Sequence, residues 1–586
     1  MRKSTIFVGL LLASTHILSA SALDFKAIDA ASTDEAKRMA IASPSVNLNG
    51  KDYMIGYNVL ARTGDKLGDG TFGLLVDAKG NAVVGGDGEQ EISVDADFTT
   101  LLPVGDKLFS VTHFESRPGA MYVSEVAQNK ETGELKYIST KPVDFSAFGG
   151  LWVPCAGSVT PWGTHLGSEE YPPNVRGIED AQSLDDIDDY FKPFARYFGL
   201  NPDTMSLEDF RGVFSPYQYG YATEITVTAD GNATAAKHYA LGRSAFELAY
   251  VMPDQRTVFF SDDGTNVGLY MFVADEAGKL DAGVTYAAKW NQTSKAGGGT
   301  ANIDWVSLDH ATSEEVKAYI DNGTKFYDIF DIANVAEDGT CADGFSPVNT
   351  SDGAECLKIK EGMEVAASRL ETRRYAALKG ATTEFRKEEG ITFAPEYNKL
   401  FVAMSEVAKG MEDGSKNDIA GYNDIRLDKN ACGAVYELDV RPNASIGSDY
   451  VPTNMNAMIA GRPYEYAEGS AWAGNSCFID GISNPDNITW IAGNDTLIIG
   501  EDTGSGHQND VIWSMNYPTK QLTRIFSTPY GSETTSPYIY TNINGFGYLM
   551  AVIQHPYGES DEDKLNNPTD AQAYVGYVGP LPALSE

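Results

Sequence analysis

Acidic side chains recur at the ends of six similar stretches of this sequence. The stretches are residues 98–115, 157–170, 247–263, 389–406, 486–502 and 536–559. Polar residues that open a stretch are Glu247, Glu389, Asp486 and Asn487, and acids that close one are Glu115, Glu169, Glu170, Asp262, Asp263, Glu406, Glu501 and Asp502. Such oxygen ligands suit hard cations such as Ca²⁺. If the ends meet in the fold, we expect bound cations among them, because clustered carboxylates repel one another. The alternative is that each acid only caps a turn.

Each stretch has the pattern of a β-hairpin, with an apolar strand, a turn signal and a second apolar strand. Further strand signals between the stretches, such as residues 268–273 and 433–440, would complete four-stranded sheets. The repeat therefore predicts an all-β chain that forms a six-bladed β-propeller with helical and loop insertions. In a propeller, equivalent hairpin ends converge at one mouth of the central channel. A series of β-sandwiches is the alternative, but it would not require the same hairpin six times.

Five cysteines give a second source of chemistry. Cys341 and Cys356 enclose a polar, Gly- and Asp-rich segment, which predicts a loop closed by a disulfide. Cys432 and Cys477 lie at the two edges of another long connecting segment and form a plausible second pair. Cys155 then remains free. At this point it is equally well interpreted as a buried thiol or as a thiolate that binds a metal ion.

The N-terminal residues 1–22 have the pattern of a secretory signal peptide. Positive charge at Arg2 and Lys3 precedes an apolar run, and small residues follow at 20–22. We expect cleavage to leave no membrane anchor and to place the protein in the periplasm or outside the cell. Residues 23–586 are expected to form one catalytic propeller domain, with insertions at about 172–218 and 286–379. The first insertion has two segments typical of short capped helices.

The charge balance excludes one class of partner. The chain has 82 acidic and 44 basic residues, a formal net charge of −38, whereas nucleic-acid binding requires clustered Lys and Arg. An acidic protein that handles an anionic substrate needs local positive charge, which bound cations can supply. Only six of the seven histidines lie outside the signal peptide. A hard cation with oxygen ligands therefore fits the composition better than a zinc site of several imidazoles.

One motif carries a family resemblance. The string Cys155-Ala-Gly-Ser-Val-Thr-Pro-Trp-Gly-Thr-His-Leu-Gly-Ser-Glu-Glu170 closely resembles the hallmark of the PhoX-type alkaline phosphatases. Supporting matches occur in family order at residues 219–225, 246–247, 380–382, 484–487 and 554–559. The resemblance runs from about residue 95 to 580. It implies a six-bladed propeller whose channel mouth holds iron and calcium, with a Cys thiolate among the iron ligands.

The resemblance also implies roles for individual residues. Cys155 and Glu247 are expected to hold Fe. The residues expected at Ca are Glu169, Glu170, Glu389, Asp486, Asn487 and Glu559. The family's substrate-facing arginine falls on Lys387 or Arg386, with Glu389 two residues beyond Lys387. The expected reaction is hydrolysis of small phosphate monoesters by a monomer.

Two other functions stay open on the sequence alone. A calcium-dependent lactonase or esterase can use the same fold and an acidic channel mouth, but it has no need of a thiolate. A non-catalytic, calcium-binding propeller would hold structural Ca without iron.

Overall fold

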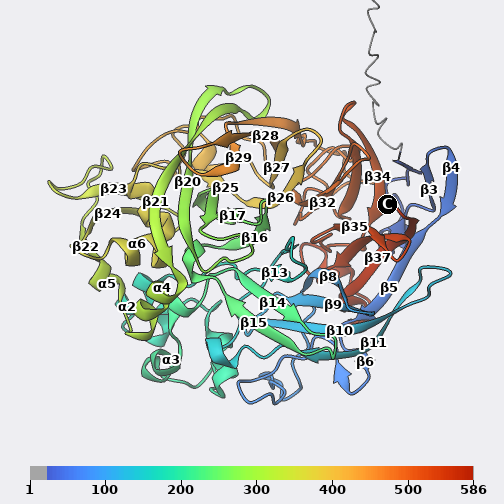
Figure 1. Cartoon of the computed structure of the whole chain (residues 1–586), viewed down its shortest axis with the longest axis horizontal. Coiled ribbons are helices and arrows are strands. Elements are labelled where there is room, and N and C mark those ends of the chain that lie inside the picture. The colour runs from blue at the N-terminus through green and yellow to red at the C-terminus, as the bar shows by residue number, and fades with distance from the viewer. Residues whose placement is uncertain (1–22, 585–586) are drawn as a thin grey trace, which may run out of the picture.

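The computed structural model describes residues 23–584, and the predicted signal peptide lies outside them. Antiparallel strands dominate the described chain (Figure 1). None of the helices described between residues 23 and 584 has the length and apolarity needed to cross a bilayer.

Hairpins lie where the sequence repeat predicts them. Within residues 23–584 they are β8 (Ala96–Val104) with β9 (Lys107–Phe114), β12 (Ser158–Val159) with β13 (His165–Gly167), β16 (Phe246–Val251) with β17 (Thr257–Asp262), β26 (Glu388–Ala394) with β27 (Lys399–Met404), β31 (Pro485–Ile491) with β32 (Thr496–Glu501), and β35 (Tyr538–Ile543) with β36 (Phe546–Ile553). Every pair is antiparallel. The six predicted hairpins are therefore confirmed.

Further strands extend each hairpin on one side. In chain order they are β10 (Ala120–Gln128) and β11 (Leu135–Pro142), β14 (Thr223–Val227) and β15 (Ala233–Lys237), β19 (Tyr270–Ala274) and β20 (Ala282–Ser294), β28 (Ala434–Asn443) and β30 (Asn454–Ala460), β33 (Val511–Asn516) and β34 (Gln521–Ser527), and β37 (Tyr574–Pro582) and β5 (Gly56–Arg62). The first strand of each hairpin is thus the innermost strand of its sheet. The long strand β21 (Thr300–Thr312) joins the third and fourth sheets through its pairing with β30.

The inner strands contact one another in series. β12 packs on β16, β16 on β26, β26 on β31, and β31 on β35, while β8 contacts both β35 and β13. Figure 1 shows the labels of these hairpins around the middle of the molecule. Apolar clusters fill the space between consecutive sheets, including the pair formed by the last sheet and the first. Burial of these apolar faces is the main force that holds the sheets together.

The last sheet contains strands from both ends of the chain. β5 pairs with β37, with Arg62 opposite Tyr574 and Gly56 opposite Gly579. The sheet therefore joins the N-terminal part of the described chain to its C-terminal strand.

The first insertion covers one side of the hairpin ends. It contains α2 (Val175–Asp180) and α3 (Leu207–Val213), and Ser206 caps α3 through a capping box with Asp209. Between these helices the chain forms only 3₁₀ turns, at 184–186 and 192–198, where the sequence predicted the first of two capped helices. The short turns pack aromatic side chains around the buried Trp152.

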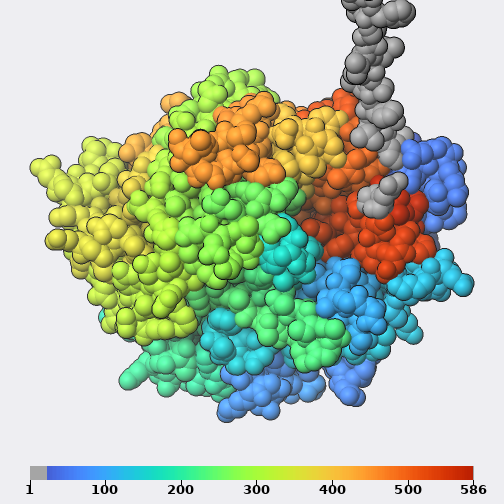
Figure 2. Space-filling view, viewed as in Figure 1, coloured from blue at the N-terminus to red at the C-terminus, as the bar shows by residue number. Residues whose placement is uncertain are grey.

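The second insertion forms a bulge at the left edge of the space-filling view (Figure 2). It contains α4 (Ser313–Asp321), α6 (Glu364–Leu370), α7 (Thr372–Leu378) and the small sheet of β22 (Phe330–Ala333), β23 (Ser346–Thr350) and β24 (Gly353–Ile359). The predicted disulfide Cys341–Cys356 lies here.

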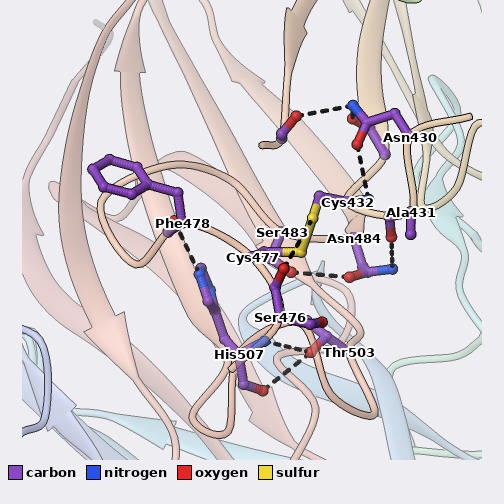
Figure 3. The surroundings of a disulfide bond; sticks show 12 residues. Asn430, Ala431, Cys432, Ser476, Cys477, Phe478, Ser483, Asn484, Thr503 and His507 are labelled. Carbon is purple, nitrogen blue, oxygen red and sulfur yellow. Dashed lines mark hydrogen bonds between the residues drawn. A yellow bond between two sulfur atoms is a disulfide. The ribbon is translucent and has the colours of Figure 1, made fainter. Parts of the chain in front are cut away.

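The disulfide Cys432–Cys477 is also present, as predicted (Figure 3). The backbone N–H of Asn484 donates to the carbonyl of Cys432, and the Asn484 side chain donates to the carbonyls of Ala431 and Ser405. This disulfide therefore anchors the segment that leads into β31, the strand that carries Asp486.

Candidate metal centre

The hairpin ends surround one acidic cavity of about 460 Å³. Its carboxylates within the described chain belong to Asp95, Glu115, Glu170, Glu247, Asp263, Glu389, Glu406, Asp486, Asp502, Glu533 and Glu559. Each of the six hairpins contributes to this set, either at the start of its first strand or after the end of its second. The predicted convergence of acids from separate repeats is therefore present in the structure.

A recurring β-bulge directs one side chain of several inner strands toward the centre. The pairing register shifts between Ala96 and Thr99 in β8, and at the corresponding place in β16, β26 and β31. The residues that enter these bulges are Asp97, Glu247, Glu389 and Asp486. A bulge adds a residue on one strand and changes the direction of its side chain. Four sheets thus use the same backbone device to present an acid.

Consecutive acids at the ends of second strands have different roles. Asp263 and Asp502 line the cavity, whereas the preceding Asp262 and Glu501 do not. Asp262 is bound by Arg373 of α7, and Glu501 accepts hydrogen bonds from His507 and Trp513. Alternate residues of an extended chain point to opposite sides. The expectation that Asp262 and Glu501 lie at the shared mouth is therefore wrong.

Glu169 follows the same rule and is not part of the cavity lining. One carboxylate oxygen accepts from Lys237 Nζ at 2.7 Å and from the Trp152 N–H at 2.9 Å. The other accepts from the N–H groups of Gly220 and Tyr221. Both oxygens are thus occupied in a fully buried ion pair. Glu169 therefore holds the start of the first insertion, and only Glu170 of this pair lines the cavity.

Three overlapping groups of donor atoms follow one another around the cavity. They are Asp97 with Glu115 and Cys155, Cys155 with Glu170 and Glu247, and Glu247 with Glu389 and Asp486, and the donor atoms of each group lie within 4.8 Å of one another. Burial, and then the neighbouring carboxylates, raise the pKa of Glu170, Glu247 and Asp486 well above the usual range. A cation among them would offset both effects.

Cys155 is the free cysteine of the described chain, and it is buried. Its N–H donates to Ser168 Oγ at 3.0 Å, and its Sγ lies 3.3 Å from Asp97 Oδ2. Burial and the neighbouring carboxylates raise the pKa of the Cys155 thiol well above its usual range. Without a cation this sulfur stays protonated, and a soft metal ion is the partner that would stabilise its thiolate form.

A pair of buried histidines supports the Cys155 backbone. His113 Nδ1 bonds to the carbonyl oxygen of Cys155, and its Nε2 lies 2.6 Å from His165 Nε2. His165 Nδ1 in turn lies 3.0 Å from Thr100 Oγ1. A carbonyl can only accept, so His113 carries its proton on Nδ1, His165 donates from Nε2, and Thr100 donates to His165. Burial lowers the pKa of His113 to about 4, in agreement with a neutral pair.

The two basic residues predicted to contact substrate are held by acids. Lys387 Nζ lies 2.9 Å from Asp502 and 3.4 Å from Glu389. Arg386 Nε donates to Glu406 at 2.8 Å, and its Nη1 donates to the carbonyl of Gly264 at 3.1 Å. Both side chains line the cavity, and each already has an acidic partner.

Asn487 lies behind the ligand groups and orients two of them. Its side-chain N–H groups donate to Glu247 Oε1 and to Asp486 Oδ1, each at 2.8 Å. Its amide oxygen accepts from Ser536 Oγ at 2.5 Å. All the polar atoms of the Asn487 side chain therefore contact other side chains of the site.

The donor set fits a site for more than one metal ion. Asp486 Oδ2 is buried and has no hydrogen-bond partner in the structure, although a buried carboxylate oxygen needs one. Carboxylates around it suit Ca²⁺, and the thiol of Cys155 suits a softer transition metal such as iron. The chemistry of the residues present therefore agrees with a mixed metal centre.

The comparison with protein families decides between the open interpretations. A sequence profile described as Alkaline phosphatase PhoX matches residues 120–542. The chain belongs to the PhoX alkaline phosphatase family. It is therefore a phosphatase, and the resemblance found in the motifs is confirmed. Members of the PhoX family depend on metal ions and are exported. A comparison with curated proteins found no match.

Solved structures give the fold. The structure of Pseudomonas fluorescens PhoX in complex with vanadate, a transition state analogue, matches with 18% identity and a TM-score of 0.58, and the match covers 95% of this chain and 98% of that chain. The chain thus shares the fold of a PhoX protein. A putative 6-phosphogluconolactonase from Bacteroides uniformis matches with 11% identity and a TM-score of 0.26, over 86% of this chain and 95% of that chain. A periplasmic gluconolactonase from Pseudomonas aeruginosa matches with 10% identity and a TM-score of 0.27, over 88% of this chain and 98% of that chain.

The PhoX motif after Cys155 forms a tight turn that is tied to the next strand. Trp162 Nε1 and Thr164 Oγ1 both donate to Glu224 Oε1, at 2.7 and 2.6 Å. His238 lies 2.8 Å from the other oxygen of Glu224. The motif therefore fixes the β12–β13 hairpin against β14 and β15, and it acts on the site through the position of Cys155.

Asp97 and Glu533 are site residues that the sequence-based set omits. Asp97 lies six positions before Pro103, as Cys155, Glu247 and Glu389 lie six before Pro161, Pro253 and Pro395. That spacing is a signal that could have found it. Glu533 lies between strands, 3.4 Å from His555, and no repeat position marks it.

Proposed function

We propose that this chain is an exported, iron- and calcium-dependent phosphatase that hydrolyses phosphate monoesters in the acidic cavity. The observation that carries the proposal is the series of three donor groups, with the Cys155 thiol shared by the first two. Family membership supports the phosphatase reaction.

We further propose that the sheets form a six-bladed β-propeller. The support is that consecutive inner strands contact one another around the molecule and that β8 contacts β35. The pairing of β5 with β37 would fasten the last blade with strands from both parts of the chain. In this arrangement the cavity is one mouth of the central channel.

The proposed ligands divide by the hardness of their donors. Iron would be held by Cys155 and Glu247, with Asp97 and Glu115 beside them, and calcium by Glu170, Glu389, Asp486 and Glu559. When bound, these ions supply charge neutralisation for the phosphoryl oxygens and activation of an oxygen nucleophile. Asn487 holds the carboxylates of Glu247 and Asp486 in place, and Lys387 holds those of Glu389 and Asp502.

The volume of the cavity and the net charge of the chain support small phosphoesters as substrates. A volume of about 460 Å³ suits a small ligand. The formal charge of −38 argues against nucleic-acid partners. Two disulfides favour an oxidising compartment, in agreement with export to the periplasm or the medium. We propose that the enzyme acts as a monomer.

A free thiol beside the carboxylates favours this function over the two alternatives. Neither a calcium lactonase nor a structural calcium-binding protein needs a soft donor among its ligands. The test is elemental analysis of the purified protein together with hydrolysis of a chromogenic phosphomonoester at alkaline pH, with and without a calcium chelator. We expect iron and calcium in the protein and turnover that chelation abolishes. Protein that holds calcium without iron and hydrolyses no phosphoester would contradict the proposal.

A further inference from the structure

Four side chains that can carry positive charge line the cavity in the described chain, and three of them are engaged by acids. They are Arg386, Lys387, His555 and Arg117. Lys387 is held by Asp502 and Glu389, and Arg386 by Glu406. His555 Nε2 lies 3.4 Å from Glu533 and 3.6 Å from Glu559. A substrate oxyanion would have to compete with a carboxylate for each of these groups.

Arg117 is different. Its side chain makes no hydrogen bond or ion pair within residues 23–584, although it lines a cavity rich in acids. Its guanidinium carbon lies 3.3 Å from the centroid of the Tyr190 ring. Contact with an aromatic face uses the flat side of a guanidinium and leaves its in-plane N–H donors available.

The surroundings of Tyr190 hold this ring at the cavity. Tyr190 belongs to the first insertion and packs against Trp152, Tyr171 and Phe191, with ring centroids 6.5, 6.2 and 6.1 Å apart. Tyr171 is itself bound through its hydroxyl to Asp263, a cavity carboxylate. The insertion therefore supplies a fixed aromatic surface against which Arg117 rests, while Arg117 follows β9 in the first sheet.

We propose that Arg117, held against Tyr190, binds the phosphoryl oxygens of the substrate and of inorganic phosphate. This inference rests on the proposed phosphatase function. A planar guanidinium presents paired N–H donors that match two oxygens of a phosphate, which a lysine ammonium cannot do. The role that the sequence assigned to Lys387 or Arg386 passes to Arg117 because its donors have no protein partner.

The experiment compares the metal-loaded wild-type enzyme with Arg117→Gln and Arg117→Lys. Charged hydrogen bonds of this kind predict that Arg117→Gln raises both the KM for a chromogenic monoester and the dissociation constant of inorganic phosphate, measured by calorimetry, by about 10- to 100-fold. Arg117→Lys should fall between the wild type and Arg117→Gln. Tyr190→Ala, which removes the ring, should weaken phosphate binding more than Tyr190→Phe, which keeps it. Arg462→Gln is the matched control, because Arg462 stacks on Phe478 at 3.8 Å outside the cavity, and it should change neither constant.

Unchanged phosphate affinity in a folded, metal-loaded Arg117→Gln protein would overturn the inference. The inference would also be overturned if Arg117→Lys and Arg117→Gln lost phosphate binding to the same extent and both variants also lost iron and calcium. Arg117 would then act on metal binding and not on phosphate. The calorimetric measurement separates this inference from the proposed function. If the wild type binds phosphate through Arg117 but hydrolyses no monoester, the proposed reaction fails and the binding role stands.

Discussion

Cys155 Sγ and Asp97 Oδ2 lie 3.3 Å apart in a buried part of the site. The other oxygen of Asp97 accepts from the hydroxyl of Thr535 at 2.5 Å and lies 2.6 Å from Ser536 Oγ. Burial raises the pKa of both acidic groups, so the thiol and the carboxyl compete for protons in the absence of a cation. A metal ion at this position would take the place of the proton between them.

The variant Cys155→Ser tests this relationship. A serine hydroxyl holds its proton far more tightly than a thiol, so it replaces a thiolate ligand poorly. We expect a folded protein that keeps part of its calcium but loses iron and phosphatase activity. Elemental analysis, circular dichroism and the monoester assay check the three parts. Full activity in a folded, iron-free Cys155→Ser protein would refute the role of Cys155.

Calcium should change the stability of the wild type more than that of Asp486→Asn. Asp486 shares a donor group with Glu247 and Glu389, and its Oδ2 is buried without a hydrogen-bond partner among the described residues. When a chelator removes the metal ions, the wild type keeps the repulsion among its buried carboxylates. We therefore expect the free energy of unfolding of the variant to be at least as large as that of the wild type. Calcium at about 100 times its Kd should stabilise the wild type by about 2.7 kcal/mol and the variant by much less. Urea unfolding with and without calcium measures this difference, with the exposed Glu314→Gln on α4 as the control. An equal response of wild type and Asp486→Asn would count against Asp486 as a calcium ligand.

His113→Leu should weaken metal binding without unfolding the protein. The substitution removes the donor to the Cys155 carbonyl and the acceptor for His165, so the Cys155 loop loses its support. Changes in groups that orient ligands reduce metal affinity or activity by about 10- to 100-fold. His113→Gln, whose amide can still donate, should recover part of the loss. Iron titration beside thermal unfolding separates this positioning role from general destabilisation, and His310→Leu on the exposed surface is the control. A fall in melting temperature at unchanged iron affinity would show that His113 is only structural.

The two disulfides should differ in their effect on activity. The disulfide Cys341–Cys356 joins residues 15 positions apart in the second insertion. The disulfide Cys432–Cys477 joins residues 45 positions apart, beside β31. Loop-closure entropy predicts losses of about 3 and about 4 kcal/mol in the free energy of unfolding when each is removed. Only the second loss should lower phosphatase activity, because only that disulfide anchors the segment leading to Asp486. Paired Cys→Ser variants, assayed under conditions where both remain folded, test this. Equal activity in the two variants would argue that the anchor is dispensable.

The sequence predicted the hairpins because their repeat is a local pattern. Each strand has enough apolar residues, and each turn enough Gly, Pro or Asp, for its limits to be found without long-range information. The first of the two helices predicted in the first insertion is replaced by 3₁₀ turns for a physical reason. Its aromatic residues at 191–198 are used to pack around Trp152, and short 3₁₀ turns fit that packing better than a continuous helix.

The sequence predicted which kinds of residue form the candidate site, but not which of their side chains point into the cavity. A pair such as Glu169 and Glu170 gives no sign of which carboxylate meets Lys237 and which meets the cavity, because Lys237 arrives from a distant strand. The same holds for Lys387, whose sequence neighbours do not reveal its contact with Asp502. Arg117 lay outside every repeat position, and only the packing of the first insertion shows its contact with Tyr190.

The pairing of β5 with β37 affects when the enzyme can become active. A ribosome delivers Gly56 long before Gly579, so the sheet that contains both cannot be completed until synthesis is nearly finished. Contacts between such distant parts of a chain form slowly. Glu533 and Glu559 also belong to the last part of the chain to emerge, so a partly made chain carries only part of the donor set. A chain cut short before β37 would leave the edges of β5 and β36 open to association with other strands.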